Sequence, residues 1–226
     1  MDDPPILPGL SARQAAGLRA RGIRTRRQLL AVVDELPAAA RAYLTHQPKM
    51  CVPLAEADDV VKKVIGSLRF NGRTLSARQA LAVGSIRRRK PRIKDLDVLI
   101  IAPREWRDVL ANLRVGNSAV RVLDSYTSGD RRRSLIVRTA GGKYKVDLFL
   151  ARHSERAFAL YHHTGSRRYN IRIRAHAKSR GWKLNQYGLF SARTGKPVAG
   201  SGSVRTEEQL AALLGVTYRR PVDRTV

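Results

Sequence analysis

Three aspartates in this strongly basic chain have the type and spacing that suit a metal site. Asp95-Leu96-Asp97 leads directly into the apolar, β-branched run 98–102, which predicts a buried strand. Alternate residues on a strand point to the same face, so we expect both carboxylates to project together. Neighbouring anions repel unless a cation lies between them, and Mg²⁺ suits oxygen ligands. The pair therefore predicts a metal-binding site.

The third carboxylate, Asp147, is the odd residue in an otherwise apolar strand. Val146 precedes it and Leu148 follows it, inside the segment 144–150, whose alternation predicts a strand. A charge in such surroundings needs a counter-charge or a metal.

The basic stretch 87–94 offers a competing interpretation of the acidic pair. Asp95 and Asp97 would then simply form ion pairs at the start of a strand. The upstream context favours chemistry, because a glycine turn at Gly84-Ser85 offers backbone N–H groups and a hydroxyl to a phosphate.

Composition indicates the class of partner. Lys and Arg total 44 of 226 residues against 18 Asp and Glu, a net charge of +26. Such a surplus attracts polyanions, of which nucleic acid is the commonest inside cells. An anionic membrane is the rival, but the basic residues are spread along the chain and no amphipathic anchor stands out. The hydrophobic content of 43% is enough for a globular fold.

Other sequence features restrict location and chemistry. No apolar run approaches the roughly 18 residues of a membrane helix, and the N-terminus lacks the basic start of a secretory signal. We therefore expect an intracellular protein without membrane contact. Cys51 is the one cysteine, which excludes intramolecular disulfides and a cysteine-rich zinc site.

Periodicity and capping signals give the elements that must position the carboxylates. Residues 6–50 read as helical, with capping boxes at Ser11 and Thr25. The middle of the chain predicts helices at 56–68 and from Pro103 to about Leu113, and strands at 98–102, 119–126, 133–139 and 144–150. The segment 74–83 is ambiguous between strand and helix. The C-terminal part predicts a turn at 164–166, a basic helix ending near Gly181, hairpin-like strands around 183–190 and 196–199, and a capped helix from Thr206 to Gly215.

These elements predict an α+β protein: a palm-like mixed sheet flanked by helices, a small C-terminal α/β subdomain and a short helical N-terminal segment. We expect a helical DNA-binding segment at 1–55, a catalytic palm at 56–160 and a nucleotide- and template-binding subdomain at 161–226.

The order of these motifs resembles a known family. Gly84-Ser85, a basic loop, Asp95-x-Asp97 and a third aspartate on a later strand are similar to the signature of the polymerase beta-like nucleotidyltransferases. Thr164-Gly165-Ser166, the run from Arg172 to Ala177 and the strand segment 183–190 resemble DNA polymerase family X, in a layout similar to that of a small viral member. The resemblance covers roughly residues 57–220.

This resemblance implies the roles of the carboxylates and the phosphate-binding turn. Asp95, Asp97 and Asp147 would hold two Mg²⁺ ions, for which Mn²⁺ would substitute. Asp147 would lie nearest the primer 3′-hydroxyl and help to accept its proton. The β- and γ-phosphates of the incoming nucleotide would be held by Gly84, Ser85 and Arg88.

The C-terminal motifs imply contacts with nucleotide and DNA. Gly165 would let the incoming sugar pack against backbone, and Asn170 would reach the minor-groove edge of the nascent pair. DNA contacts would come from the basic helix, through Arg172, Arg174 and Lys178. A solvated basic face is the alternative for that helix.

Two histidines depart from the family pattern. The family carries an aromatic pair before Thr-Gly, whereas this chain has His162 and His163. One of them would stack on or hydrogen-bond the incoming nucleotide, and a purely structural role is the alternative for His163. Leu54 stands where larger members carry an arginine that contacts the triphosphate.

The N-terminal segment resembles a degenerate helix-hairpin-helix. Gly9-Leu10-Ser11-x-x-x-Ala15 follows the family pattern with Ser11 in place of the second glycine, and Gly9 would approach a DNA phosphate. We expect 5′-deoxyribose-phosphate lyase activity to be absent, because no segment matches the domain that carries it in polymerase beta.

The function expected from these residues is that of a DNA-directed DNA polymerase. It would add deoxynucleotides to a primer 3′ end and fill short gaps in DNA repair. The partners would be gapped or primer–template DNA and deoxynucleoside triphosphates, bound by a monomer. The alternatives are a template-independent nucleotidyltransferase and a non-catalytic basic DNA-binding module.

Overall fold

The computed structural model describes residues 7–102, 109–127 and 129–224. The chain combines helices with a mixed central sheet, and the expected α+β class is confirmed. The helices, in chain order, are α1 (Ala12–Ala20), α2 (Arg26–Ala31), α3 (Ala38–His46), α4 (Leu54–Ser67), α5 (Gly84–Arg87), α6 (Val109–Asn112), α7 (Arg156–Thr164), α8 (Arg167–Ser179) and α9 (Glu207–Leu214). Short 3₁₀ helices cover Val33–Glu35, His153–Glu155, Ser201–Ser203 and Pro221–Asp223.

The central sheet has the strand order β4-β6-β10-β9-β8. Its members are β4 (Ala80–Ala82), β6 (Leu96–Ile101), β8 (Arg121–Thr127), β9 (Arg132–Thr139) and β10 (Gly142–Ala151). Neighbouring strands run antiparallel except for β6 and β10, which pair in parallel. The smaller sheets are formed by β1 (Val52–Pro53) with β5 (Arg92–Ile93), by β2 (Leu68–Phe70) with β3 (Arg73–Thr74) and β7 (Arg114–Val115), and by β11 (Trp182–Asn185) with β12 (Gly188–Ser191).

The two faces of the central sheet are covered unequally. Val146 and Leu148 of β10 point into the main core, where Val60 and Val64 of α4 pack against the sheet. The opposite face packs against Ala159 of α7 through a smaller apolar cluster with Leu99 and Ile101 of β6 and Val83. That smaller cluster covers one end of the face, and Asp97 and Asp147 stand on the same face toward the other end.

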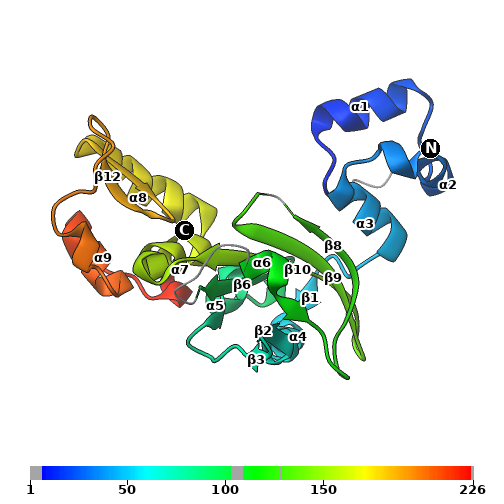
Figure 1. The fold of residues 1–226 in the computed structure, drawn as a ribbon. Coiled ribbons are helices and arrows are strands. Elements are labelled where there is room, and N and C mark those ends of the chain that lie inside the picture. The colour runs from blue at the N-terminus through cyan, green and yellow to red at the C-terminus, as the bar shows by residue number, and fades with distance from the viewer. Residues whose placement is uncertain (1–6, 103–108, 128, 225–226) are drawn as a thin grey trace.

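The N-terminal and C-terminal helices lie at opposite ends of the sheet (Figure 1), and each group has its own apolar cluster. The capping boxes expected at Ser11, Thr25 and Thr206 all form, and each cap side chain accepts a hydrogen bond from the backbone three residues later. At the sheet edge, α3 contacts β8, where His46 Nε2 lies 3.4 Å from Asp124 Oδ2.

Some expected elements differ in the structure. Residues 183–190 form a complete hairpin turning at Gln186-Tyr187, whereas 196–199 contributes a single bridge between Pro197 and Phe190, because proline cannot donate to a ladder. The ambiguous segment 74–83 contains β4, which pairs with β6. The first part of the helix expected at 103–113 lies outside the described residues, and its last turn is α6.

Candidate active site

The parallel pairing of β6 and β10 brings two of the three aspartates side by side. Asp97 and Asp147 are Cα partners in that register, so their side chains leave neighbouring strands on the same face. Asp95 precedes β6 and is exposed. The parallel pairing of β6 with β10 is therefore what brings Asp147 next to the acidic pair.

Both carboxylate oxygens of Asp147 have partners. Ser134 Oγ donates to Oδ1 at 2.5 Å, and Lys145 Nζ and Arg132 Nη2 donate to Oδ2 at 2.6 and 2.9 Å. Lys145 Nζ also lies 3.3 Å from Asp95 Oδ1. Lys145 and Arg132 thus supply the counter-charge that the lone carboxylate in an apolar strand requires.

The carboxylates differ in their affinity for protons. Burial, together with the charges of Asp147 and Asp95, raises the pKa of Asp97 to about 7. Burial alone would raise the pKa of Asp147 too, but Lys145, Ser134 and Arg132 hold it below its usual range. Asp97 is therefore the carboxylate with the greatest need of an additional cation.

The ligand atoms of this site are of the chemical type that binds divalent metal ions. The oxygens of Asp95, Asp97 and Asp147 are the hard ligands that Mg²⁺ and Mn²⁺ prefer, and burial together with the two neighbouring carboxylates raises the pKa of Asp97. Within the described residues no three acidic, histidine or cysteine side chains are gathered tightly enough to hold a metal. Lys145 and Arg132 lie against the carboxylates of this site.

Gly84 brings the backbone of α5 against the carboxylate of Asp97. Its φ of +59° lies in the left-handed region, and a Cβ at this position would lie 2.1 Å from Asp97 Oδ2. No other residue type fits without displacing the aspartate. The glycine turn expected to serve a phosphate therefore lies directly beside the acidic site.

Arg88 joins this turn to the C-terminal helices. Its guanidinium donates to the carbonyl oxygen of Thr164 and, at 2.9 Å, to Ser85 Oγ. Its Nε is buried and has no hydrogen-bond partner among the described residues. Gly165, with φ +70°, leaves room for the guanidinium, since a Cβ there would lie 3.0 Å from Arg88 Nη1. The motifs around residues 84–88 and 164–166 thus meet in space.

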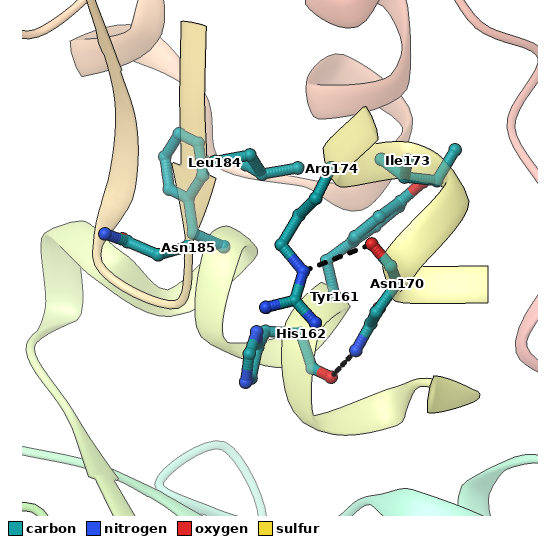
Figure 2. A pocket seen from close by; sticks show the side chains of 8 residues that line it. Tyr161, His162, Asn170, Ile173, Arg174, Leu184 and Asn185 are labelled. Atoms are coloured by element: carbon teal, nitrogen blue, oxygen red, sulfur yellow. Dashed lines mark hydrogen bonds between the residues drawn. The ribbon is translucent and has the colours of Figure 1, made fainter. Parts of the chain in front are cut away.

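His163 and His162 have different surroundings. The ring of His163 stacks on Phe149 with centroids 4.2 Å apart, and burial lowers its pKa to about 3. His162 lines a small pocket with Asn170 and Arg174 (Figure 2), and burial lowers its pKa as well. Packing against protein favours the structural role for His163, whereas His162 is partly buried beside a small pocket.

Hydrogen bonds from side chains to backbone carbonyl oxygens connect the residues of the pocket in Figure 2. Asn170 Nδ2 donates to the carbonyl oxygen of His162 at 2.7 Å, and Arg174 Nε donates to the carbonyl oxygen of Asn170 at 3.2 Å. Arg172 and Lys178, on the same helix, are exposed like Arg174, and Arg172 lies over the ring of Tyr169. The structure therefore brings Asn170 and Arg174 together, and it leaves all three basic side chains accessible on the surface of α8.

The surroundings of Gly9 and Leu54 bear on the roles expected for these two positions. Gly9 has φ +94°, and a Cβ there would lie 2.7 Å from Ala39 and the backbone of Ala40, so close packing on α3 by itself requires glycine. Leu54 begins α4 and packs against the main core, so this side chain offers no cation to a triphosphate.

Sequence reasoning missed Lys145 and Arg132. A signal existed for Lys145, because residues 145 and 147 alternate on one strand and share a face. For Arg132 none existed, since it is one of 44 basic residues and reaches Asp147 only through the pairing of β9 with β10.

The chain is similar to known DNA polymerases. Residues 159–225 match the family model of the DNA polymerase beta thumb. The repair DNA polymerase X of African swine fever virus is 36% identical over 173 residues, which cover 72% of this chain and 95% of the viral protein. The rat DNA polymerase lambda is 31% identical over 191 residues, covering 76% of this chain and 33% of that protein.

A solved structure confirms the fold. The ternary primer–template complex of Leishmania infantum polymerase beta superposes with a TM-score of 0.69 at 22% identity, covering 97% of this chain and 96% of that one. No helix of the described residues is long and apolar enough to span a membrane. The similarity to the viral enzyme over nearly its whole length shows that the chain belongs to DNA polymerase family X.

Proposed function

We propose that this DNA polymerase fills short gaps in DNA repair, adding deoxynucleotides to a primer 3′ end with Asp95, Asp97 and Asp147 as the ligands of two magnesium ions. The observation that carries the proposal is the pairing of Asp97 with Asp147 across parallel strands, beside the backbone of Gly84. The names of the similar proteins, a repair polymerase and a lambda polymerase, support the repair assignment.

The residues around the carboxylates would divide the work. Bound divalent ions would lower the pKa of the primer 3′-hydroxyl and neutralise the triphosphate and the leaving pyrophosphate. Asp147 would orient that hydroxyl and accept its hydrogen bond. Ser85 and the unpartnered Nε of Arg88 would donate to phosphate oxygens beside the Gly84 turn.

The segments flanking the sheet would bind the substrates. We assign the helices of residues 1–55 to duplex DNA, the palm at 56–160 to catalysis, and residues 161–226 to the incoming nucleotide and the template. The grouping of His162, Asn170 and Arg174 supports the last assignment, because α7 and α8 bring an aromatic ring and polar side chains together there. The chain would act as a monomer inside the cell.

Primer extension tests the proposal. The protein is incubated with a one-nucleotide gapped duplex, Mg²⁺ and each deoxynucleotide in turn, beside Asp147→Asn and the control Asp130→Asn, an exposed turn residue. Templated extension by the wild type and the control, lost in Asp147→Asn, supports it. Untemplated tailing would favour the transferase alternative. Duplex binding without extension by the wild type would contradict catalysis altogether.

The expected absence of lyase activity stays a prediction. A gapped duplex that carries a 5′-deoxyribose phosphate tests it, because borohydride would trap a covalent adduct only if a lysine of this protein attacked the sugar.

A further inference from the structure

The carboxylate of Asp147 is fully engaged by protein groups, and this raises the question of how a metal reaches it. Ser134 holds Oδ1, while Lys145 and Arg132 both hold Oδ2. A divalent ion bound to Oδ2 at roughly 2.1 Å would meet two positive charges within hydrogen-bond reach of the same oxygen. One of the two cations must therefore leave when a metal binds.

The two cations differ in how firmly they are held. The side chain of Lys145 is 12% exposed and is shared between Asp147 and Asp95, whereas that of Arg132 is 41% exposed. Among the described residues, Arg132 forms an ion pair with Asp147 alone, and its Nε is buried without a hydrogen-bond partner. Arg132 is the cation that loses less by moving away.

The neighbouring arginines of the run 131–133 are committed elsewhere. Arg131 forms an ion pair with Glu155 at 2.7 Å, and Arg133 donates to the carbonyl oxygens of Leu110 and Leu113. Arg132 is the member of the run that turns to the acidic site, and it also lies over the ring of Phe149.

A phosphodiester is the natural second partner for this side chain. Guanidinium groups bind phosphate oxygens through paired hydrogen bonds, and they do so best where the phosphate is partly shielded from water. The 3′-hydroxyl that Asp147 would serve arrives together with the phosphodiester of the primer's last nucleotide. A guanidinium released from Asp147 would be free to pair with that phosphate.

We propose that Arg132 is a displaceable counter-ion, which holds Asp147 until a divalent metal takes the carboxylate and the terminal phosphodiester of the primer takes the guanidinium. This inference rests on the proposed role of Asp147 as a metal ligand. It makes metal and primer binding cooperative, since each releases the group that the other needs, and the coupling must be equal in both directions. Lys145 stays in place as the permanent counter-charge of the site.

Metal binding by the free protein is the first part of the test. Mn²⁺ is titrated into the wild type, Arg132→Gln, Asp147→Asn and the control Arg138→Gln, with free Mn²⁺ measured by electron paramagnetic resonance. Arg138 is exposed on the same strand, away from the carboxylates. Removing the competing cation is expected to tighten Mn²⁺ binding roughly fivefold in Arg132→Gln. Arg138→Gln should match the wild type, and Asp147→Asn should bind more weakly.

The coupling to DNA is the second part. Affinity for a fluorescent gapped duplex is measured by anisotropy in EDTA and in Ca²⁺, without nucleotide, so that no extension occurs. Ca²⁺ should strengthen duplex binding by the wild type and by Arg138→Gln, and much of that gain should vanish in Arg132→Gln. Arg132→Lys, which keeps the charge but not the paired donors, should retain part of the gain. Circular dichroism spectra confirm that each variant is folded.

The outcomes separate the counter-ion role from the metal assignment. If Asp147→Asn weakens Mn²⁺ binding but Arg132→Gln binds Mn²⁺ no more tightly than the wild type, the counter-ion role alone is overturned. The same conclusion follows if the Ca²⁺-dependent gain in duplex affinity is unchanged in Arg132→Gln. If Asp147→Asn leaves Mn²⁺ binding unchanged, the metal assignment fails and the counter-ion role fails with it.

Discussion

Two ionic clusters in this polymerase use the same chemistry in different surroundings. In the acidic site, Arg132 and Lys145 hold Asp147, and Arg132 remains 41% exposed. In the C-terminal cluster, Glu207 of α9 is held by Arg87 at 2.6 Å and by Arg224 at 2.9 Å, and the side chain of Arg224 is 0% exposed.

Three tyrosine rings surround the guanidinium of the C-terminal cluster and keep it in place. The guanidinium of Arg224 lies 4.5, 5.4 and 5.6 Å from the ring centroids of Tyr161, Tyr169 and Tyr218. The side chain of Glu207 is 4% exposed, and Arg87 also donates to Thr164 Oγ1 at 2.5 Å. The two carboxylates are equally buried, at 4% exposed, so burial of the cation distinguishes an ion pair that fixes the position of an element, as at α9, from the one that we propose exchanges with a ligand at Asp147.

The largest expected effect is in the C-terminal cluster. Glu207→Gln leaves the buried guanidinium of Arg224 without a counter-charge, so we expect the free energy of unfolding to fall by about 3–5 kcal/mol in urea denaturation. Glu208→Gln, a change at the exposed neighbouring residue, is the matched control and should cost little. Equal losses of unfolding free energy in both variants would show that the ion pairs of Glu207 add no stability beyond that of an exposed acidic residue.

The acidic site should instead respond to pH. The pKa of Asp97 is raised to about 7 in the folded state, so between about pH 4 and 7 the folded protein binds a proton that the unfolded chain has lost. The metal-free protein should therefore lose stability as pH rises through this window, by roughly 2 kcal/mol after a discount for partial exposure.

Asp97→Asn removes this pH dependence. In EDTA the variant should equal the wild type in stability near pH 4 and exceed it near pH 8, as measured by urea denaturation across that range. Asp130→Asn serves as the control and should keep the wild-type slope. A slope that persists in Asp97→Asn would assign the titration to another group.

Removing the carboxylate of Asp147 should cost less than removing that of Glu207. Lys145 keeps Asp95 as a partner and Arg132 reaches solvent, so Asp147→Asn should lower the free energy of unfolding in EDTA by about 1 kcal/mol. Thermal melts with and without Mn²⁺ extend the comparison, because Mn²⁺ should raise the Tm of the wild type and of Glu208→Gln but not that of Asp147→Asn. A loss as large as that of Glu207→Gln would contradict the distinction between the clusters.

A surface pair in which both partners are exposed sets the lower limit of the comparison. Lys63 and Asp59 lie one turn apart on α4, 2.7 Å from each other, with side chains 38% and 59% exposed. Lys63→Gln should change the free energy of unfolding by only about 0.3–0.5 kcal/mol, and less at high salt. Denaturation at low and high salt checks this, and a larger effect would mean that exposure is a poor guide to the other pairs.

Sequence reasoning reached the carboxylates because each stood out locally. Asp147 interrupts an apolar strand, and Asp95 and Asp97 adjoin another, so alternation and composition were enough to flag them. The capping boxes at Ser11, Thr25 and Thr206 were also local and form as expected.

No local sequence pattern identifies the partners of these residues. The parallel register that sets Asp97 opposite Asp147 joins residues fifty positions apart. Glu207 looked like an ordinary acidic residue in the first turn of a helix, and its burial depends on Arg87, which lies 120 positions away. In a chain with 44 basic residues, charge alone cannot indicate which arginine faces which acid.

The central claim is that Asp97 and Asp147 share a divalent metal and that Arg132 then turns away. A crystal of the protein with a gapped duplex, a non-hydrolysable nucleotide and Mn²⁺ tests it through anomalous scattering. We predict a manganese peak roughly 2.1 Å from oxygens of both aspartates, with the Arg132 guanidinium on the primer phosphate. A peak elsewhere, with Arg132 still bound to Asp147, would contradict the account.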